Sequence, residues 1–225
     1  MKFSEWEPVY TEIISDLNLN RGDDENSARM LKALTLNSDL ILGDDLINVI
    51  KDTVTVFGDA DSLEDDIASL NPEGTLISAG SATERLVKMN IIPDIVVTDL
   101  DGDMDSQIEV SGSGAITVVL AHGDNSDAIA EHIKSFRGPL IITTQSTPMG
   151  IVENYGGFTD GDRAVCIARH FGAKKIILEG FDFENPRMRR GNDRETSLKK
   201  LKWAEKIIFG MNPPDVQIVR PESSI

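Results

Sequence analysis

Four aspartates lie within seven residues of one another in the segment IVVTDLDGDMD, which spans residues 95–105. The apolar run 95–97 is typical of a short buried strand, and the aspartates at positions 99, 101, 103 and 105 follow it. Because like charges repel, a divalent cation is the usual reason for gathering carboxylates, and open α/β sheets bind ligands beyond the carboxyl ends of their strands. The segment predicts a Mg²⁺ site that handles phosphates, with a solvated acidic turn as the alternative.

The spacing of these aspartates narrows the choice of metal. A calcium loop of the EF-hand type needs Gly at its sixth position and Glu at its twelfth, and neither the register that begins at Asp99 nor the one at Asp101 has them. The segment also contains no His or Cys, so its hard oxygen ligands favour Mg²⁺ or Mn²⁺ over zinc.

The composition argues against several classes of protein. The 225 residues carry a net charge of −16, which disfavours nucleic acid or an anionic membrane as the main partner. The sequence has no apolar run of membrane-spanning length and no signal-peptide pattern. Its single cysteine, Cys166, lies in an apolar helical pattern that favours a buried thiol over a nucleophile. We therefore expect a soluble, cytoplasmic protein with no membrane partner, and a homo-oligomer is compatible with this composition.

Alternating strand and helix patterns predict the elements that position the aspartates. Strands are expected at 54–57, 75–78, 95–98, 116–121, 140–143, 175–179 and 216–219, and helices between them at 82–89, 126–136, 162–171 and 195–209. This order predicts an α/β fold with a doubly wound, mostly parallel, Rossmann-like sheet in residues 53–225. Residues 1–52 are expected to form a helical N-terminal region. Its first helix should start at a capping box of Ser4 and Glu7 and end before RGDD at 21–24, with further helices near 28–36 and 44–50.

Two more loops follow predicted strands and carry polar groups. In FGDADSL, Gly58 permits a tight turn and Ser62 is a suitable N-cap, so the helix start would offer N–H groups to a phosphate; a purely structural turn is the alternative. In AHGDN, His122 and Asp124 would share the sheet edge of the aspartates if the two strands are neighbours. His122 would then contact phosphate or act as an acid, and Asp124 would complete the metal shell. The alternative is that the loop is only a helix start capped by Asn125 or Ser126.

The loop NYGGFTDGDRAV at 154–165 has glycines that allow a ligand to approach the backbone, and Thr159 or Asp160 can cap the helix that follows. Arg163 in the first turn is unexpected, because a helix N-terminus disfavours cations. Its position is explained if Arg163 pairs with Asp160 or reaches a phosphate. At the end of another strand, Glu179 and Asp182 are candidates to accept hydrogen bonds from an amino-heterocycle, and plain loop acids are the alternative.

One basic segment interrupts this acidic chain. Residues 174–206 have a charge balance of +4, whereas the rest of the chain has a balance of −20. The arginines at 187, 189, 190 and 194 predict a mobile loop that closes over polyphosphate, with Arg187 and Arg190 as the expected contacts. A solvated loop and helix face is the alternative.

Taken in order, VVTDLDGD, AHGDN, GGFTDGDRA and LEGFDF resemble the archaeal 6-hydroxymethyl-7,8-dihydropterin pyrophosphokinases, which are similar in fold to the catalytic domain of thiamin pyrophosphokinases. The resemblance covers residues 20–210. It implies Mg²⁺-dependent transfer of diphosphate from ATP to the pterin hydroxymethyl group, with release of AMP, in tetrahydromethanopterin- or folate-type pterin synthesis. Relatives often have a GxGPSL-like loop where this chain has GDADSL, and ADGA where it has AGSA, which bears on fine substrate preference.

The expected mechanism places one or two Mg²⁺ ions on Asp99, Asp101 and Asp103, where they bridge the phosphates of ATP. The acceptor hydroxyl attacks the β-phosphorus in line, and AMP leaves. Asp101 is expected to be essential for turnover, and His122 or Asp124 to orient the nucleophile or the phosphate.

Charge and acceptor recognition complete this hypothesis. Arg163 and the basic loop bind the charge that develops on the transferred group, and Glu179 or Asp182 binds the amino-pyrimidine edge of the pterin. The expected partners are ATP and a reduced pterin. Three alternatives share part of the pattern: a thiamin pyrophosphokinase, a non-catalytic nucleotide-binding module, and a nucleotide-sugar transferase with a DxD metal site.

Overall fold

The computed structural model describes residues 1–187 and 193–221 and contains a seven-stranded, all-parallel sheet. The strand order is β5-β4-β3-β2-β1-β6-β7. The strands are β1 (Thr53–Phe57), β2 (Thr75–Ala79), β3 (Ile95–Thr98), β4 (Ile116–Ala121), β5 (Leu140–Thr144), β6 (Lys175–Glu179) and β7 (Gln217–Val219). The doubly wound α/β fold predicted from the alternating pattern is confirmed. The chain runs outward from β1 to β5 and then returns to β6 on the other side of β1, so the topological switch lies between β1 and β6.

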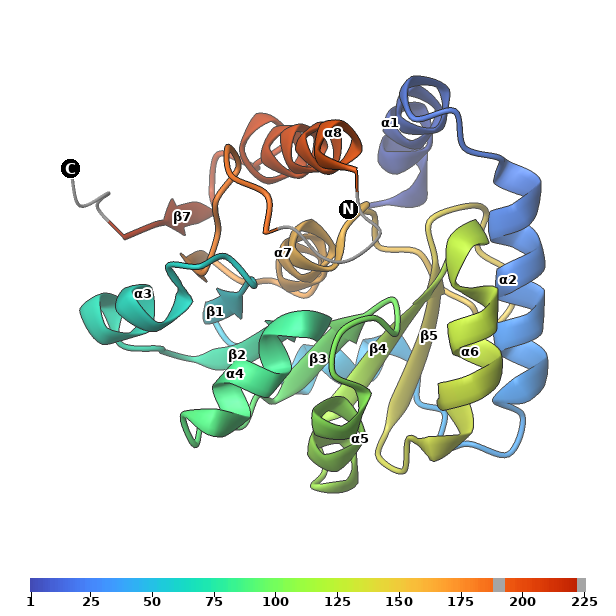
Figure 1. The fold of residues 1–225 in the computed structure, drawn as a ribbon, viewed down its shortest axis with the longest axis horizontal. Helices are drawn as coiled ribbons and strands as arrows, with labels where there is room; N and C mark the ends of the chain where they lie inside the picture. The colour runs from blue at the N-terminus through green and yellow to red at the C-terminus, as the bar shows by residue number, and fades with distance from the viewer. Residues whose placement is uncertain (188–192, 222–225) are drawn as a thin grey trace.

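Helices cover both faces of the sheet (Figure 1). The α-helices are α1 (Phe3–Asp16), α2 (Arg21–Leu34), α3 (Leu63–Leu70), α4 (Thr83–Lys88), α5 (Met104–Gly112), α6 (Ser126–His132), α7 (Asp160–His170) and α8 (Arg194–Glu205). Short 3-10 turns η1 to η4 lie at Gly43–Asn48, Gly80–Ala82, Gly123–Asn125 and Ile133–Ser135, and a π-helical segment, η5, lies at Lys206–Gly210.

Successive side chains of β3 point to opposite faces of the sheet and pack against different helices. Val97 packs in the core cluster shared with α7, whereas Val96 packs against α5 on the opposite face. The neighbouring strand β4 continues this pattern, because Val118 is paired with Val97 and faces α7, while Val119 faces α2 and α6. Strands buried on both faces read as continuous apolar runs, which is why they were recognisable in the sequence.

The N-terminal helices begin at different residues from those expected. The first helix starts at Phe3 rather than at Ser4, and Lys2 N donates to Glu5 Oε2 at 2.8 Å. Helix α1 ends at Asp16, before RGDD as expected, and RGDD itself opens α2, with the Asn20 side chain accepting from the backbone N–H of residue 22 at 2.9 Å. Acidic residues favour a helix N-terminus, so RGDD suits a start better than a stop.

Helices α1 and α2 pack directly on the rest of the fold. Ala28 and Leu31 of α2 share a core cluster with β4, β5 and α6. Trp6 and Tyr10 of α1 pack near Cys166, whose side chain is fully buried. Its burial confirms the expected buried thiol and raises the pKa of Cys166 to about 11. None of the helices in the part of the chain that the structure describes is long and apolar enough to cross a membrane.

Candidate active site

The loop after β3 turns sharply and so places two aspartates at the sheet edge. Thr98 Oγ1 accepts from Leu100 N at 2.9 Å, and Leu100 itself is buried with a left-handed φ of 66°. Gln107 Nε2 from α5 donates to the carbonyl oxygen of Asp101 at 2.7 Å and holds the far side of the turn. A left-handed non-glycine residue is uncommon and typical of functional loops. The turn therefore holds Asp99 and Asp101 on either side of a buried leucine.

A third carboxylate reaches the same place from α7. Asp160 is the first residue of this helix. Asp162 fixes the start of the helix, because Asp162 Oδ2 accepts from Thr159 N at 2.9 Å and from Thr159 Oγ1 at 2.7 Å. Space for Asp160 depends on Gly80, because a Cβ at that position would lie 2.6 Å from Thr98 Oγ1 and 3.1 Å from Asp160 Oδ2.

Asp99, Asp101 and Asp160 form the carboxylate triad of the site. One oxygen from each lies within 4.8 Å of the other two. Burial raises the pKa of Asp160 well above its ordinary value, with Asp99 and Asp101 adding to the effect, and Asp160 Oδ1 is buried without a hydrogen-bond partner in the described structure. A buried oxygen of this kind, facing two like charges, is what a divalent cation satisfies. The all-oxygen donor set fits Mg²⁺ or Mn²⁺.

The loop after β4 lies beside the triad, as expected from the neighbouring strands β3 and β4. His122 Nε2 lies 3.3 Å from Asp99 Oδ2. Asn125 is nearly buried and ties the two loops together: its Nδ2 donates to the carbonyl oxygens of Asp99 at 2.8 Å and of Leu120 at 2.7 Å, while its Oδ1 accepts from His122 N at 3.0 Å. Asn125 thus fixes the approach of His122 to Asp99 rather than capping α6 with its side chain.

A cleft of about 330 Å³ opens above the triad at the carboxyl ends of the strands. Open α/β sheets bind ligands at this edge. The residues predicted from the sequence that line it are Gly58, Asp99, Asp101, His122, Asp124, Thr159, Asp160, Asp182 and Arg187.

Other predicted residues lie away from the cleft. Asp103 caps α5, because its Oδ1 accepts from Ser106 N at 2.8 Å, and this bonding lowers the pKa of Asp103. Arg163 is fully buried and donates to the carbonyl oxygen of Gly157 at 2.6 Å, while burial lowers the pKa of its guanidinium. Neither residue lines the cleft.

Ser62 and Arg190 were also predicted to belong to the site. Ser62 occupies the N-cap position of α3, as predicted, but its hydroxyl donates to Asp66 Oδ2 at 2.9 Å instead of accepting from a backbone N–H of the helix. Arg190 lies outside the described residues.

The acids after β6 differ in their surroundings. Glu179 is fully buried outside the cleft, with no hydrogen-bond partner for either carboxylate oxygen in the described structure. Burial, with a smaller contribution from Asp66, raises the pKa of Glu179 to about 7. Asp182 does line the cleft, but its Oδ1 accepts from Glu184 N at 2.8 Å and from Asn185 N at 2.9 Å within its own loop.

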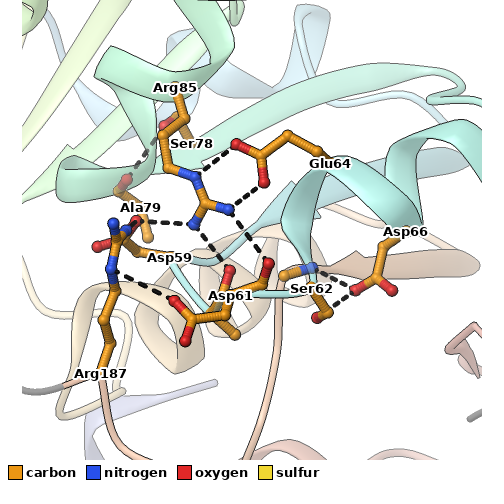
Figure 2. Close-up of polar contacts among 11 residues, drawn as sticks. Asp59, Asp61, Ser62, Glu64, Asp66, Ser78, Ala79, Arg85 and Arg187 are labelled. Carbon is orange, nitrogen blue, oxygen red and sulfur yellow. Dashed lines mark hydrogen bonds and ion pairs between the residues drawn. The ribbon is translucent and has the colours of Figure 1, made fainter.

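Arg85 on α4 braces the loop after β1 and was not anticipated from the sequence (Figure 2). Its guanidinium donates to the Ala60 carbonyl oxygen at 2.7 Å, pairs with Asp59 at 3.2 Å and contacts Glu64 Oε1 at 2.8 Å. Asp59 also pairs with Arg187 from the loop after β6. Asp59 thus connects Arg85 to a cleft-lining arginine, and no strand-end or glycine signal in the sequence marks Arg85.

A buried network around Asp24 also escaped sequence reasoning. Asp24 is 3% exposed; its Oδ2 accepts from Tyr10 OH at 2.5 Å and Gln145 Nε2 at 2.8 Å, and its Oδ1 accepts from Gly123 N at 2.7 Å. The Asp24 network therefore holds Gly123, the residue that follows His122. One signal was available: Asp24 lies four and seven positions before Ala28 and Leu31, on the apolar stripe of α2.

The fold and the site define a doubly wound α/β protein with a carboxylate triad suited to a divalent cation and a cleft at the strand ends. Residues 28–187 match the family described as 6-hydroxymethylpterin diphosphokinase MptE-like. Three relatives are each called 6-hydroxymethyl-7,8-dihydropterin pyrophosphokinase. The Pyrococcus furiosus protein is 38% identical, covering 92% of this chain and 93% of the relative. The Methanothermobacter thermautotrophicus protein is 41% identical, covering 81% and 79%, and the Methanocaldococcus jannaschii protein is 33% identical, covering 92% and 95%.

The chain belongs to the 6-hydroxymethylpterin diphosphokinase MptE-like family. It is therefore an enzyme of the diphosphotransferase class, as the resemblance of its four motifs implied.

Proposed function

We propose that this protein transfers the β,γ-diphosphate of ATP to the hydroxymethyl group of 6-hydroxymethyl-7,8-dihydropterin, with Mg²⁺ bound by Asp99, Asp101 and Asp160. Family membership supports the reaction, and the grouping of three carboxylate oxygens within 4.8 Å at the floor of the cleft carries the assignment of the metal site. Asp160 takes the place expected for Asp103, because Asp103 is engaged at the start of α5.

The metal supplies charge neutralisation for the phosphates and stabilises the transition state of diphosphoryl transfer. The chain's own residues orient the reactants. Asn125 holds the His122 loop against β3, so His122 Nε2 lies 3.3 Å from Asp99 Oδ2, and His122 lines the cleft. The acceptor oxygen forms a bond to the β-phosphorus as the bond to the α,β-bridging oxygen breaks, and AMP leaves with that oxygen. The hydroxyl proton is released to water in this proposal, and His122, whose Nε2 lies 3.3 Å from Asp99 Oδ2 and whose Nδ1 accepts from Asp124 N at 3.3 Å, orients the acceptor.

Arg187 is the described arginine placed to bind the transferred charge. Its side chain is 45% exposed at the cleft and is paired with Asp59 and, at 3.6 Å, with Asp61. An arginine that already lies at the rim can exchange these partners for phosphate oxygens, for which its planar donors are well suited. Arg163, which is fully buried, acts in this proposal as a countercharge beneath Asp160 rather than as a phosphate ligand. We place the reaction in the cytoplasm.

The reaction is tested by measuring AMP formation from ATP and Mg²⁺ in three parallel assays: with 6-hydroxymethyl-7,8-dihydropterin, with thiamin, and with no acceptor. The proposal predicts AMP only with the pterin. Thiamin-dependent AMP would keep the chemistry and overturn the acceptor, and equal AMP without any acceptor would overturn the transfer reaction.

A further inference from the structure

The cleft has two ends of different chemistry, on either side of the carboxylate triad. The first, here called the α2 end, lies over β4 and β5 and is lined by Asn20, Asp23, Asp24, Gly123, Asp124 and Gln145. The second, the α8 end, is lined by residues 58–60 after β1, by residues 180–183 and 185–187 after β6, and on α8 by Ser197, Lys200, Leu201 and Ala204. Strand β3, which carries Asp99, lies between β4 and the β2-β1-β6 half of the sheet, so the triad separates the two ends.

Positive charge is confined to one of these ends. Among the described cleft-lining residues, the Lys and Arg side chains are Arg187 and Lys200, and both belong to the α8 end. The α2 end instead holds Asp23, Asp24 and Asp124. A triphosphate is attracted to the positive charges of the α8 end and repelled by the carboxylates of the α2 end, even when a metal offsets part of its charge.

The acids of the α8 end are already engaged, whereas two at the α2 end are available. Asp59 is paired with Arg85 and Arg187, and Asp182 accepts hydrogen bonds from its own loop. By contrast, no hydrogen bond or ion pair within residues 1–187 and 193–221 engages the carboxylates of Asp23 and Asp124, which line the cleft and are exposed. An exposed carboxylate at a cleft wall is a good acceptor for paired N–H donors of a ligand.

The α8 end also coincides with the topological switch between β1 and β6. Gly58 and Gly180 cross there so closely that a Cβ on either would lie 2.4 Å from the carbonyl oxygen of the other. Nucleotides bind doubly wound sheets at such a switch point. Position in the sheet and charge therefore favour the same end for the nucleotide.

We propose that ATP occupies the α8 end and the reduced pterin the α2 end, where Asp23 and Asp124 accept hydrogen bonds from the N–H groups of its amino-pyrimidinone ring. This assignment rests on the proposed function. It replaces Glu179 and Asp182 as readers of the pterin, since Glu179 does not line the cleft and Asp182 is satisfied within its loop. The acceptor hydroxymethyl group then lies on the His122 side of the triad.

The test compares how each variant changes the KM for the pterin and the KM for ATP. The variant Asp23→Asn/Asp124→Asn should raise the KM for 6-hydroxymethyl-7,8-dihydropterin about tenfold or more and leave the KM for ATP within about twofold, because lost hydrogen bonds to charged groups have effects of this size. Arg187→Gln and Lys200→Gln should give the reverse split. The matched control, Asp127→Asn/Glu131→Gln on α6, removes two negative charges outside the cleft lining and should change neither constant.

A rise in the KM for ATP with the aspartate variant, or no change in either constant, overturns the assignment. Direct binding separates this failure from that of the proposed function: the intrinsic fluorescence of the pterin is titrated with wild type and variants without ATP. Pterin binding that the aspartate variant weakens supports the assignment even if no AMP forms, and absence of pterin binding to the wild type overturns it together with the proposed acceptor.

Discussion

Asp160, the first residue of α7, brings a carboxylate oxygen within 4.8 Å of an oxygen of Asp99, which directly follows β3. The two residues are far apart in the sequence and meet because α7 crosses β1, β2 and β3 on one face of the sheet. Their repulsion, added to burial, holds the pKa of Asp160 above its ordinary value. The relationship explains why a cation belongs at this point of the fold.

Replacing Asp101 tests whether the loop after β3 serves catalysis. Asp101 lines the cleft and is exposed, so Asp101→Asn should leave the free energy of unfolding nearly unchanged. We expect turnover to fall about 100-fold or more, as when one electrostatic group of an active site is removed. Steady-state AMP formation and urea unfolding measure the two quantities, and unchanged turnover would remove Asp101 from the site.

Glu179 predicts a pH dependence of stability. Burial raises its pKa from an ordinary value of 4.5 to about 7, with Asp66 as the nearby acid, so the folded state binds the proton more tightly than the unfolded state. The stabilisation from this proton is fully present below pH 4.5 and is lost as the pH rises to about 7. Glu179→Gln should therefore be more stable than wild type at pH 8, by at most about 3 kcal/mol, and nearly equal to it at pH 4.5.

Urea unfolding of both proteins across this pH range measures the difference. Because Glu179 lies outside the cleft lining, turnover at pH 8 serves as the control and should be retained. A variant that is less stable than wild type at pH 8 would show that the ionised carboxylate has a favourable role in the fold.

Tyr10→Phe tests the network that supports the His122 loop. The change removes the hydroxyl that donates to Asp24 Oδ2 at 2.5 Å, while Gln145 Nε2 and Gly123 N continue to donate to the same carboxylate. We expect the protein to lose about 1–3 kcal/mol of stability, since hydrogen bonds to charged groups contribute this much, and to keep most of its turnover. An unfolding midpoint equal to that of wild type would show that Tyr10 does not stabilise this wall of the cleft.

The sequence was sufficient for inner strands of the sheet such as β3 and β4, because they are buried on both faces and therefore read as apolar runs. It also placed the loops after β3 and β4 at one sheet edge on the condition that the two strands are neighbours, and the two strands do pair. It did not distinguish Asp101 from Asp103: alternate aspartates look equivalent in a loop, and only the start of α5 turns Asp103 into a helix cap.

Other parts of the site depend on contacts that no local pattern encodes. Thr159 and Asp160 were both candidate caps of α7; Thr159 occupies the cap position, and Asp160, for which Gly80 leaves room, joins the triad. Arg85 contacts the loop after β1 from a different helix. Asp24 lies in a run of acids that resembled a helix break, although its place on the apolar stripe of α2 indicated burial.

In the proposed mechanism Asp99, Asp101 and Asp160 bind the catalytic metal and Asp103 does not. The most direct test compares the Mg²⁺ dependence of pterin-dependent AMP formation in wild type, Asp160→Asn and Asp103→Asn; asparagine at 103 keeps the helix cap while removing the charge. We predict that Asp160→Asn needs at least about tenfold more Mg²⁺ or loses turnover, and that Asp103→Asn follows the wild-type curve. A wild-type curve for Asp160→Asn, with a shifted curve for Asp103→Asn, would contradict the account.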